Sequence, residues 1–410
     1  MSTLGWVDFS STDRERVTQI LALLREKGTL DELGIGQIRD AFSDSLFPGF
    51  STIQTRAKYF VILPRLFRDY QTLTKTEKNR KTLFVYLKDQ ENEIAKILVD
   101  RHGPVESQNS GIIGVTRIDQ GGVARRPSSI YWNGLRQFGI INTSLSLAEF
   151  CHKYGAHVST YKIATGDDGA DDSDALEYKE KVHIASNGND WLSGLSIDLT
   201  KEEATFLKDK IRHSPYIQHS IPAQLFNSGL LEDVLENKLS SFATLNHWLA
   251  SKEEISEKCR IQAAVAQNFS MAMEGAHIRF NCLIAKKMEH EKLLERYEVE
   301  FSDWRDKVSG TSLFNSDTAD IWISTARNQN SNINNKAIFF VQDWNKSILS
   351  SASLEDLDNL VSLRANRNKG KRSLLNKKLP AKDVWIGMKV LDYRWNQAQR
   401  ILNDISVGLK

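Results

Sequence analysis

The sequence predicts a mainly α fold with minor β structure, in which helix-turn-helix-like and winged-helix-like pieces surround a long helical core. Residues 254–307 have helical character, contain no proline and are interrupted only by Gly275. We therefore expect two or more helices there, broken near that glycine. Amphipathic stripes with a helical period recur elsewhere in the chain, whereas residues 111–116 and 337–341 are short apolar runs that predict strands.

The N-terminal part predicts three helices in succession. Residues 13–27 and about 36–46 each place apolar side chains on one face, and residues 47–50 then break the chain with Pro-Gly. A third helix is expected over residues 52–67, kinked by Pro64. Three helices with a tight break before the third are compatible with a helix-turn-helix, whose third element enters the major groove.

On that interpretation, the third helix would present its polar side chains to DNA. A small helical bundle with an ordinary basic face fits the same pattern. The candidate contacts are Gln54, Arg56, Lys58, Arg65 and Arg68.

Local signals predict the later elements. A helix over residues 75–99 ends before Gly103, and one over residues 128–139 resembles the helical part of a winged-helix unit. Thr200 is followed three residues later by glutamate, which is the pattern of a capping box. Further helices are expected over residues 354–365 and from about Asp383 onward.

Length and patterning suggest several domains in this chain of 410 residues. We expect an N-terminal helical domain, a winged-helix-like unit with an acidic loop, a helical core domain and a C-terminal basic helical segment. The corresponding ranges are 1–104, 105–185, 186–345 and 346–410.

Composition indicates an ordinary globular protein, with 40% hydrophobic and 26% charged residues. No apolar run is long enough to cross a bilayer, and the N-terminus lacks the pattern of a secretory signal. The three cysteines are odd in number and far apart, which argues against a disulfide framework. We therefore expect a cytoplasmic protein without membrane contact.

Positive charge is concentrated near the C-terminus, although the formal net charge is only +2. Residues 361–410 hold twelve Lys and Arg against three Asp, and residues 51–90 hold nine against three acids. The polar segment 364–382 is expected to be a mobile loop that neutralises phosphates, which gives salt-dependent binding to nucleic acid. A solvated linker, or a patch that meets an acidic partner subunit, is the alternative. The candidate contacts there are Arg364, Arg367, Lys369, Lys371, Arg372, Lys377 and Lys378.

Common catalytic and cofactor motifs are absent from the sequence. It contains no phosphate loop, no dinucleotide fingerprint after a strand and no nucleophile elbow. Cys151, His152 and His157 form the tightest grouping of metal-binding residue types, but zinc requires three or four ligands with matched geometry. We therefore expect neither a cofactor nor a metal site.

One short pattern is compatible with a nuclease. Asp174, Glu177 and Lys179 have the residue types that Mg²⁺-dependent nucleases use, in which carboxylates hold the metal and a lysine positions the attacking water. A Glu-x-Lys sequence is common by chance in charged proteins, and this one adjoins an acidic loop. It remains an alternative.

Several segments together resemble a bacterial family whose function is unassigned. The resemblance implies antiphage defence, because members of that family sit in gene neighbourhoods with helicases and phospholipase-D-like nucleases. No catalytic motif comes with it. The segments are LGWVDFS (4–10), ELGIGQIRDAF (32–42), LFPGFSTIQTRAKYF (46–60), RPSSIYWNGLR (126–136), LTKEEATFL (199–207) and LDYRW (391–395).

These observations favour a non-enzymatic accessory subunit of a bacterial antiphage defence system. It would contact DNA, expected to be double-stranded and bound with low sequence specificity, through residues 54–68 and 364–382. It would recruit or assist a partner helicase or nuclease of the same operon. The alternatives are a Mg²⁺-dependent nuclease and a structural adaptor that binds an acidic subunit without touching DNA.

Overall fold

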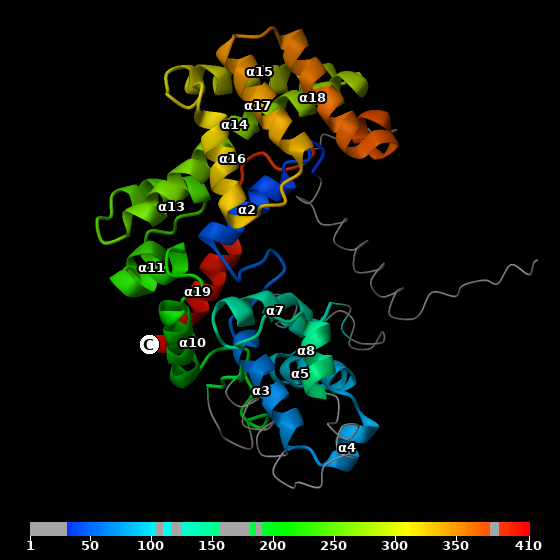
Figure 1. Cartoon of the computed structure of the whole chain (residues 1–410), viewed down its shortest axis with the longest axis vertical. Helices are drawn as coiled ribbons and strands as arrows, with labels where there is room; N and C mark the ends of the chain where they lie inside the picture. The colour runs from blue at the N-terminus through cyan, green and yellow to red at the C-terminus, as the bar shows by residue number, and fades with distance from the viewer. Residues whose placement is uncertain are drawn as a thin grey trace, which may run out of the picture. The chain divides into compact units, whose positions relative to one another are not determined.

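The protein is mainly helical over the part of the chain that the structure describes (Figure 1). This computed structural model describes residues 31–103, 110–115, 123, 125–155, 181–185, 191–377 and 385–410. Within these ranges, the only β pairing is an isolated antiparallel bridge between Ile141 and Val182. The prediction of a mainly α fold with minor β structure is confirmed, whereas the winged-helix detail is not. None of the described helices is long and apolar enough to span a bilayer.

The chain divides into two compact units, each made from two separate stretches of sequence. Unit 1 contains the described residues of Met1–Ser43 and Ile261–Tyr393, and unit 2 contains those of Asp44–Arg260 and Arg394–Lys410. The borders fall within α2 (Gly36–Leu46) and α14 (Glu257–Lys287), and between Tyr393 and Arg394.

Unit 1 further contains α15 (Glu291–Ser309), α16 (Thr318–Gln329), α17 (Asn335–Leu349), α18 (Leu354–Lys369), η3 (Gly370–Arg372) and η4 (Leu374–Asn376). Unit 2 contains α3 (Tyr59–Thr72), α4 (Lys75–Arg80), α5 (Leu83–His102), α7 (Pro127–Gln137), α8 (Leu147–Gly155), α10 (Lys201–His213), α11 (Ile221–Ser228), α12 (Leu231–Glu236), α13 (Phe242–Ala250) and α19 (Trp395–Leu409). The first predicted helix, over residues 13–27, lies outside the described residues.

Aromatic packing joins α3 to α7 in unit 2. The ring of Phe60 lies edge-on to the ring of Tyr131, and their centroids are 4.8 Å apart. The centroid of the Phe60 ring also lies 4.9 Å from that of Phe138, which follows α7.

The predicted helix over 75–99 is two helices, because Thr74 and Thr82 each cap a new start with a side-chain oxygen.

The capping box predicted at the start of α10 is confirmed. The Thr200 hydroxyl accepts a hydrogen bond from the Glu203 amide, and the Glu203 carboxylate accepts one from the Thr200 amide. α19 packs against α10 and α12. This last helix begins at Trp395, so the prediction of a start near Asp383 is wrong, and the described residues 385–394 are not helical.

The core of unit 1 forms around α14. Its buried alanines allow neighbouring helices to approach, and two tryptophans bond to its backbone. The indole N–H of Trp304 donates to the carbonyl of Met271 at 2.8 Å, and that of Trp344 donates to the carbonyl of Ala272 at 2.9 Å. Both indole N–H groups therefore have acceptors, as buried aromatic donors require.

Gly275 does not break the helix, contrary to the prediction. α14 continues to Lys287, and the chain turns at residues 288–290, where Glu289 has φ +52° and His290 caps α15 by accepting from the amide of Leu293. A Cβ at Gly275 would lie 2.5 Å from ring atoms of Trp304. The glycine is required for this close approach between α14 and α15.

We predict that Gly275→Ala destabilises unit 1 by about 1–3 kcal/mol, because the added methyl group meets a buried ring. An unobstructed helical glycine would instead gain about 1 kcal/mol from the same change. Gly310→Ala is the matched control, because nothing lies within 4 Å of a Cβ there and its φ is −82°. Urea unfolding measures both variants, and equal free energies of unfolding would contradict the argument.

Both predicted strands are wrong. Residues 337–341 belong to α17, whose start is capped by Asn334 and whose buried residues continue to Trp344 with helical spacing. The described residues 110–115 form turns, and Gly114 has φ +100°, which interrupts any strand. Thr116 lies outside the described residues.

Candidate nucleic-acid interface

The predicted basic segment near the C-terminus is helical in its described part. Arg364, Arg367 and Lys369 lie on α18, and the chain then forms the short helices η3 and η4. The prediction of a loop over 364–382 is therefore wrong for residues 364–377. Lys378, a further candidate, lies outside the described residues, as does Lys382.

Buried contacts fix the turns that follow α18. The carboxylate of Glu32 accepts hydrogen bonds from the hydroxyl of Ser373 at 2.9 Å and from the amide of Leu374 at 3.3 Å. Glu32 and Ser373 are both buried. On α18 itself, the side-chain amide of Asn368 donates to the carbonyls of Asp31 and Glu32. The start of the described chain therefore anchors this segment.

Lys287, the last residue of α14, anchors the same turns from another direction. Its ammonium group donates to the carbonyls of Leu374, Leu375 and Lys377, at 3.2, 2.5 and 2.6 Å. These acceptors are neutral carbonyls, so they do not cancel the positive charge of Lys287. It adds to the charge of the segment that it holds.

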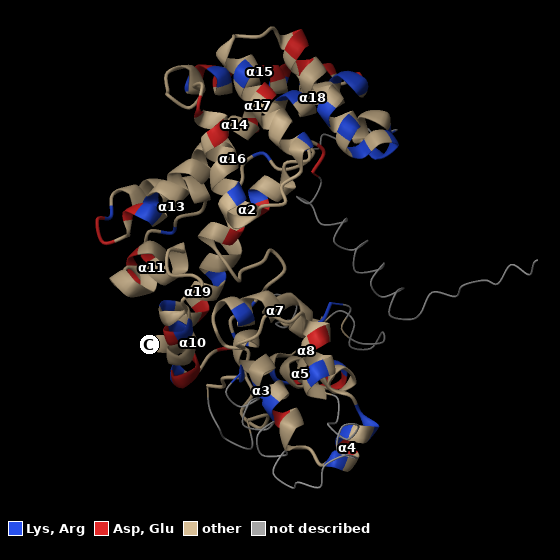
Figure 2. Cartoon of the chain, viewed as in Figure 1, with Lys and Arg blue, Asp and Glu red and all other residues tan. Residues whose placement is uncertain are grey.

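Five cations extend from this fixed segment, and we call them the cationic platform. Arg367, Lys371, Arg372 and Lys377 are exposed and Lys369 is half-buried. None of the five forms an ion pair with another described residue. Figure 2 shows Lys and Arg gathered at the end of α18 and in the turns after it. The platform therefore offers, on a defined backbone, positive charge that no described carboxylate pairs with.

Arg364 has a different position from the other candidates on α18. It is buried, and its guanidinium donates to the carbonyls of Leu33 and Gly34. Burial lowers the pKa of this guanidinium from its ordinary value. Its visible role is to tie α18 to the residues that precede α2.

The sequence predicts that the five candidates of residues 54–68 lie together on one exposed helix. This prediction is wrong. α3 begins only at Tyr59, so three of them precede it. Gln54 is buried and bonds to the carbonyl of Gly49 and the amide of Ser51. On α3 itself, Arg65 and Arg68 are half-buried, and Arg65 pairs with Asp69 at 2.9 Å.

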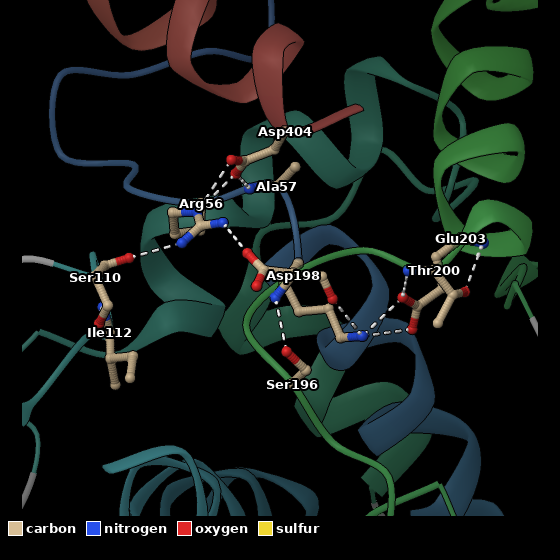
Figure 3. Close-up of polar contacts among 10 residues, drawn as sticks. Arg56, Ala57, Ser110, Ile112, Ser196, Asp198, Thr200, Glu203 and Asp404 are labelled. Carbon is tan, nitrogen blue, oxygen red and sulfur yellow. Dashed lines mark hydrogen bonds and ion pairs between the residues drawn. The ribbon is translucent and has the colours of Figure 1, made fainter. Parts of the chain in front are cut away.

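Arg56 is the centre of a network within unit 2 (Figure 3). Its guanidinium donates to the carboxylate of Asp404 at 2.9 Å, to that of Asp198 at 2.6 Å and to the carbonyl of Ser110. Burial opposes the charge, but the two carboxylates raise the pKa of Arg56 above its ordinary value. Asp404 also accepts from the amide of Ala57. These contacts connect the segment before α3 to α19.

Lys58 makes a second connection, to α10. Its ammonium group donates to both carboxylate oxygens of Glu203, at 2.8 and 2.7 Å, and to the carbonyl of Asp198. The side chain of Lys58 is only 5% exposed, so the expectation of an exposed contact is wrong for this residue. Arg56 and Lys58 have carboxylate partners within unit 2, which the platform cations lack among the described residues.

The other sequence candidates add no second site within the described residues. Asp174, Glu177, Lys179 and His157 lie outside them. Cys151 is buried, and burial raises the pKa of its thiol to about 12. No group of three or more His, Cys, Asp or Glu side chains suited to a metal ion occurs in the ranges that the structure describes.

The sequence predicts the charges of the platform but not the distant residues that hold its backbone in place. Glu32 and Lys287 lie far from the segment in sequence, and neither carries a local signal of its role.

No curated protein and no solved structure matches the chain. A family model, described as a family of unknown function, matches residues 1–408. Because this match covers nearly the whole chain, the protein belongs to that family, DUF6361.

Proposed function

We propose that this protein is a non-enzymatic accessory subunit that contacts double-stranded DNA through the cationic platform, with little sequence preference. The observation that carries the proposal is the set of five cations that lack carboxylate partners among the described residues and extend from a backbone fixed by Glu32 and Lys287. Like charges on one short segment repel one another, and a bound anion relieves that repulsion. The sugar-phosphate backbone of DNA is an anion with many regularly spaced charges.

The shape of the platform favours backbone contact over base reading. It consists of a helix end and two short 3₁₀ turns, rather than a long helix that could lie in the major groove. Lysine and arginine side chains at such positions reach phosphates whatever the base sequence. The expected binding is therefore electrostatic and tolerant of sequence.

The cellular part of the proposal is a role in bacterial antiphage defence, in which the protein assists a helicase or nuclease of the same operon. Its support is the resemblance of the segments quoted above to a family found in such gene neighbourhoods. The chemistry would then belong to the partner, and this protein would bring that partner to DNA.

We predict that replacing Lys371, Arg372 and Lys377 together with glutamine weakens binding to a short DNA duplex. The slope of log K against log salt should become shallower by about 0.9 for each phosphate that the variant no longer neutralises. Fluorescence anisotropy over a salt series measures both quantities.

The matched control removes the same charge from three exposed cations on other helices, Lys201, Lys258 and Arg327. It should leave the slope near that of the unmodified protein. An equal effect of the two triple variants would mean that only net charge matters. Absence of DNA binding at about 150 mM salt would contradict the proposal itself.

A further inference from the structure

We propose that the groove between α17 and α18 binds an acidic, amphipathic helical segment of a partner protein. The groove has a volume of about 310 Å³. This surface overlaps the proposed DNA contact only at Arg367. The inference does not depend on DNA binding.

The lining residues recur with helical spacing on both sides of the groove. Lys336, Phe339, Phe340 and Asp343 lie along one face of α17, and Leu360, Leu363, Arg364 and Arg367 lie along one face of α18. Side chains three, four and seven positions apart form a continuous stripe on a helix. Two such stripes, side by side, are the geometry into which a third helix packs.

The apolar part of the groove is open to solvent. Phe339 is 61% exposed and Leu363 is 47% exposed, so each helix contributes one large side chain that the described residues leave open to solvent. Phe340 and Leu360 lie deeper between them. A partner side chain that fills this space would cover the exposed surface of Phe339, Leu360 and Leu363 above the buried ring of Phe340, which is the arrangement of an interface anchor.

Charge within the groove is unbalanced and polarised. A short connection joins the two helices, and the guanidinium of Arg364 lies 5.7 Å from the ring centre of Phe340. The start of α17 therefore lies beside the end of α18. Lys336 and Arg367 meet at that end together with Arg364, while Asp343 lies toward the other.

The three groove cations have no carboxylate within ion-pairing distance among the described residues, and Arg364 donates only to carbonyls. Acidic side chains adjoining apolar anchors complement this arrangement. A nucleic-acid backbone would match the cations but would gain nothing from Leu360 and Leu363. The occupant that fits both properties is therefore an acidic amphipathic helix.

The test uses a fluorescein-labelled synthetic helix of about 15 residues, the length of α17. Leu and Phe occupy one face of this probe, and Glu flanks them. We expect the full-length protein to bind this probe more tightly than a companion in which Lys replaces Glu. Phe339→Ser together with Leu363→Ser should weaken binding at least about tenfold. Lys336→Gln with Arg367→Gln should weaken it and reduce its salt dependence, whereas Asp343→Asn should not weaken it.

Two controls distinguish probe binding in the groove from nonspecific hydrophobic binding and from DNA binding. Ile321→Ser removes an exposed apolar side chain on α16, outside the groove, and should leave probe binding unchanged. The Phe339 and Leu363 variant should keep DNA binding, and the Lys371, Arg372 and Lys377 variant should keep probe binding. Absence of probe binding, equal binding of the lysine probe, or groove variants that bind as the unmodified protein does would each overturn the inference.

Discussion

Replacing Asp358 with alanine should lower the free energy of unfolding of unit 1 by roughly 3–5 kcal/mol, because it leaves a buried charge without its main partner. The side chain of Arg279 is fully buried on α14. Its guanidinium donates to one oxygen of Asp358 at 2.8 and 2.6 Å and to Glu298 at 2.7 Å. Lys286 donates to the other oxygen of Asp358 at 2.8 Å. The alanine variant removes three of these four bonds.

The size of this effect depends on burial as well as on the number of bonds. Asp358 is 12% exposed, whereas Glu298 is 32% exposed and takes part in a single bond to Arg279. Glu298→Ala should therefore be markedly milder than Asp358→Ala, since water can partly replace it. The guanidinium also stacks 4.9 Å from the ring centre of Phe301, so it is held in place even when one carboxylate is removed.

A double variant distinguishes the cost of an unpaired charge from that of impaired packing. Arg279→Met with Asp358→Leu removes both charges while keeping apolar volume, and such replacements are often close to neutral. Urea unfolding should show this variant well above Asp358→Ala in stability. If the double variant were as unstable as the single one, the loss of stability would come from packing around α18 and not from the buried guanidinium.

The fold could be predicted from the sequence where the determining contacts are local. The capping box at Thr200 and Glu203 lies within four residues, and it formed as expected. The prediction of a strand over residues 337–341 is wrong because a short apolar run fits either a strand or a helix. Two features outside the run decide for a helix. One is the cap at Asn334, and the other is the helical spacing of the buried residues, which continues to Trp344.

At the candidate site, the sequence likewise does not predict ion pairs between residues that are far apart in the chain. Arg56 reads as a free surface cation in the sequence because its partners, Asp198 and Asp404, are 142 and 348 residues away. The positive charge of residues 367–377 could be predicted from the sequence because no described carboxylate pairs with these cations. Local composition therefore predicts the surface charge of this segment. The anchors Glu32 and Lys287 act from distant segments, which is why the sequence indicated a loop there.

Glu91 should make the stability of unit 2 fall as pH rises, and Glu91→Gln should abolish most of that fall. This glutamate on α5 is 2% exposed, and one of its oxygens accepts from the amide of Ser128 at 2.5 Å, near the start of α7. The other oxygen has no hydrogen-bond partner among the described residues. Desolvation raises the pKa of Glu91 to about 7, from an ordinary value of 4.5.

The direction of the pH effect follows from which state holds the proton. Below about pH 4.5, Glu91 is protonated in both the folded and the unfolded chain, and its burial costs least. Between about pH 4.5 and pH 7 the unfolded chain releases the proton while the folded chain keeps it, so stability falls as pH rises. A pKa shift of this size corresponds to about 3 kcal/mol once both states are ionised.

Glutamine keeps an oxygen that can accept from Ser128 but carries no charge, so it isolates the ionisation of Glu91. At about pH 5 the variant and the unmodified protein should have similar free energies of unfolding, and at about pH 8.5 the variant should be more stable by up to about 3 kcal/mol. Urea unfolding across this range measures the difference. Two stability curves that run parallel across it would show that Glu91 is already ionised in the fold. Its charge would then be held by the start of α7 and by Arg126, which lowers its pKa.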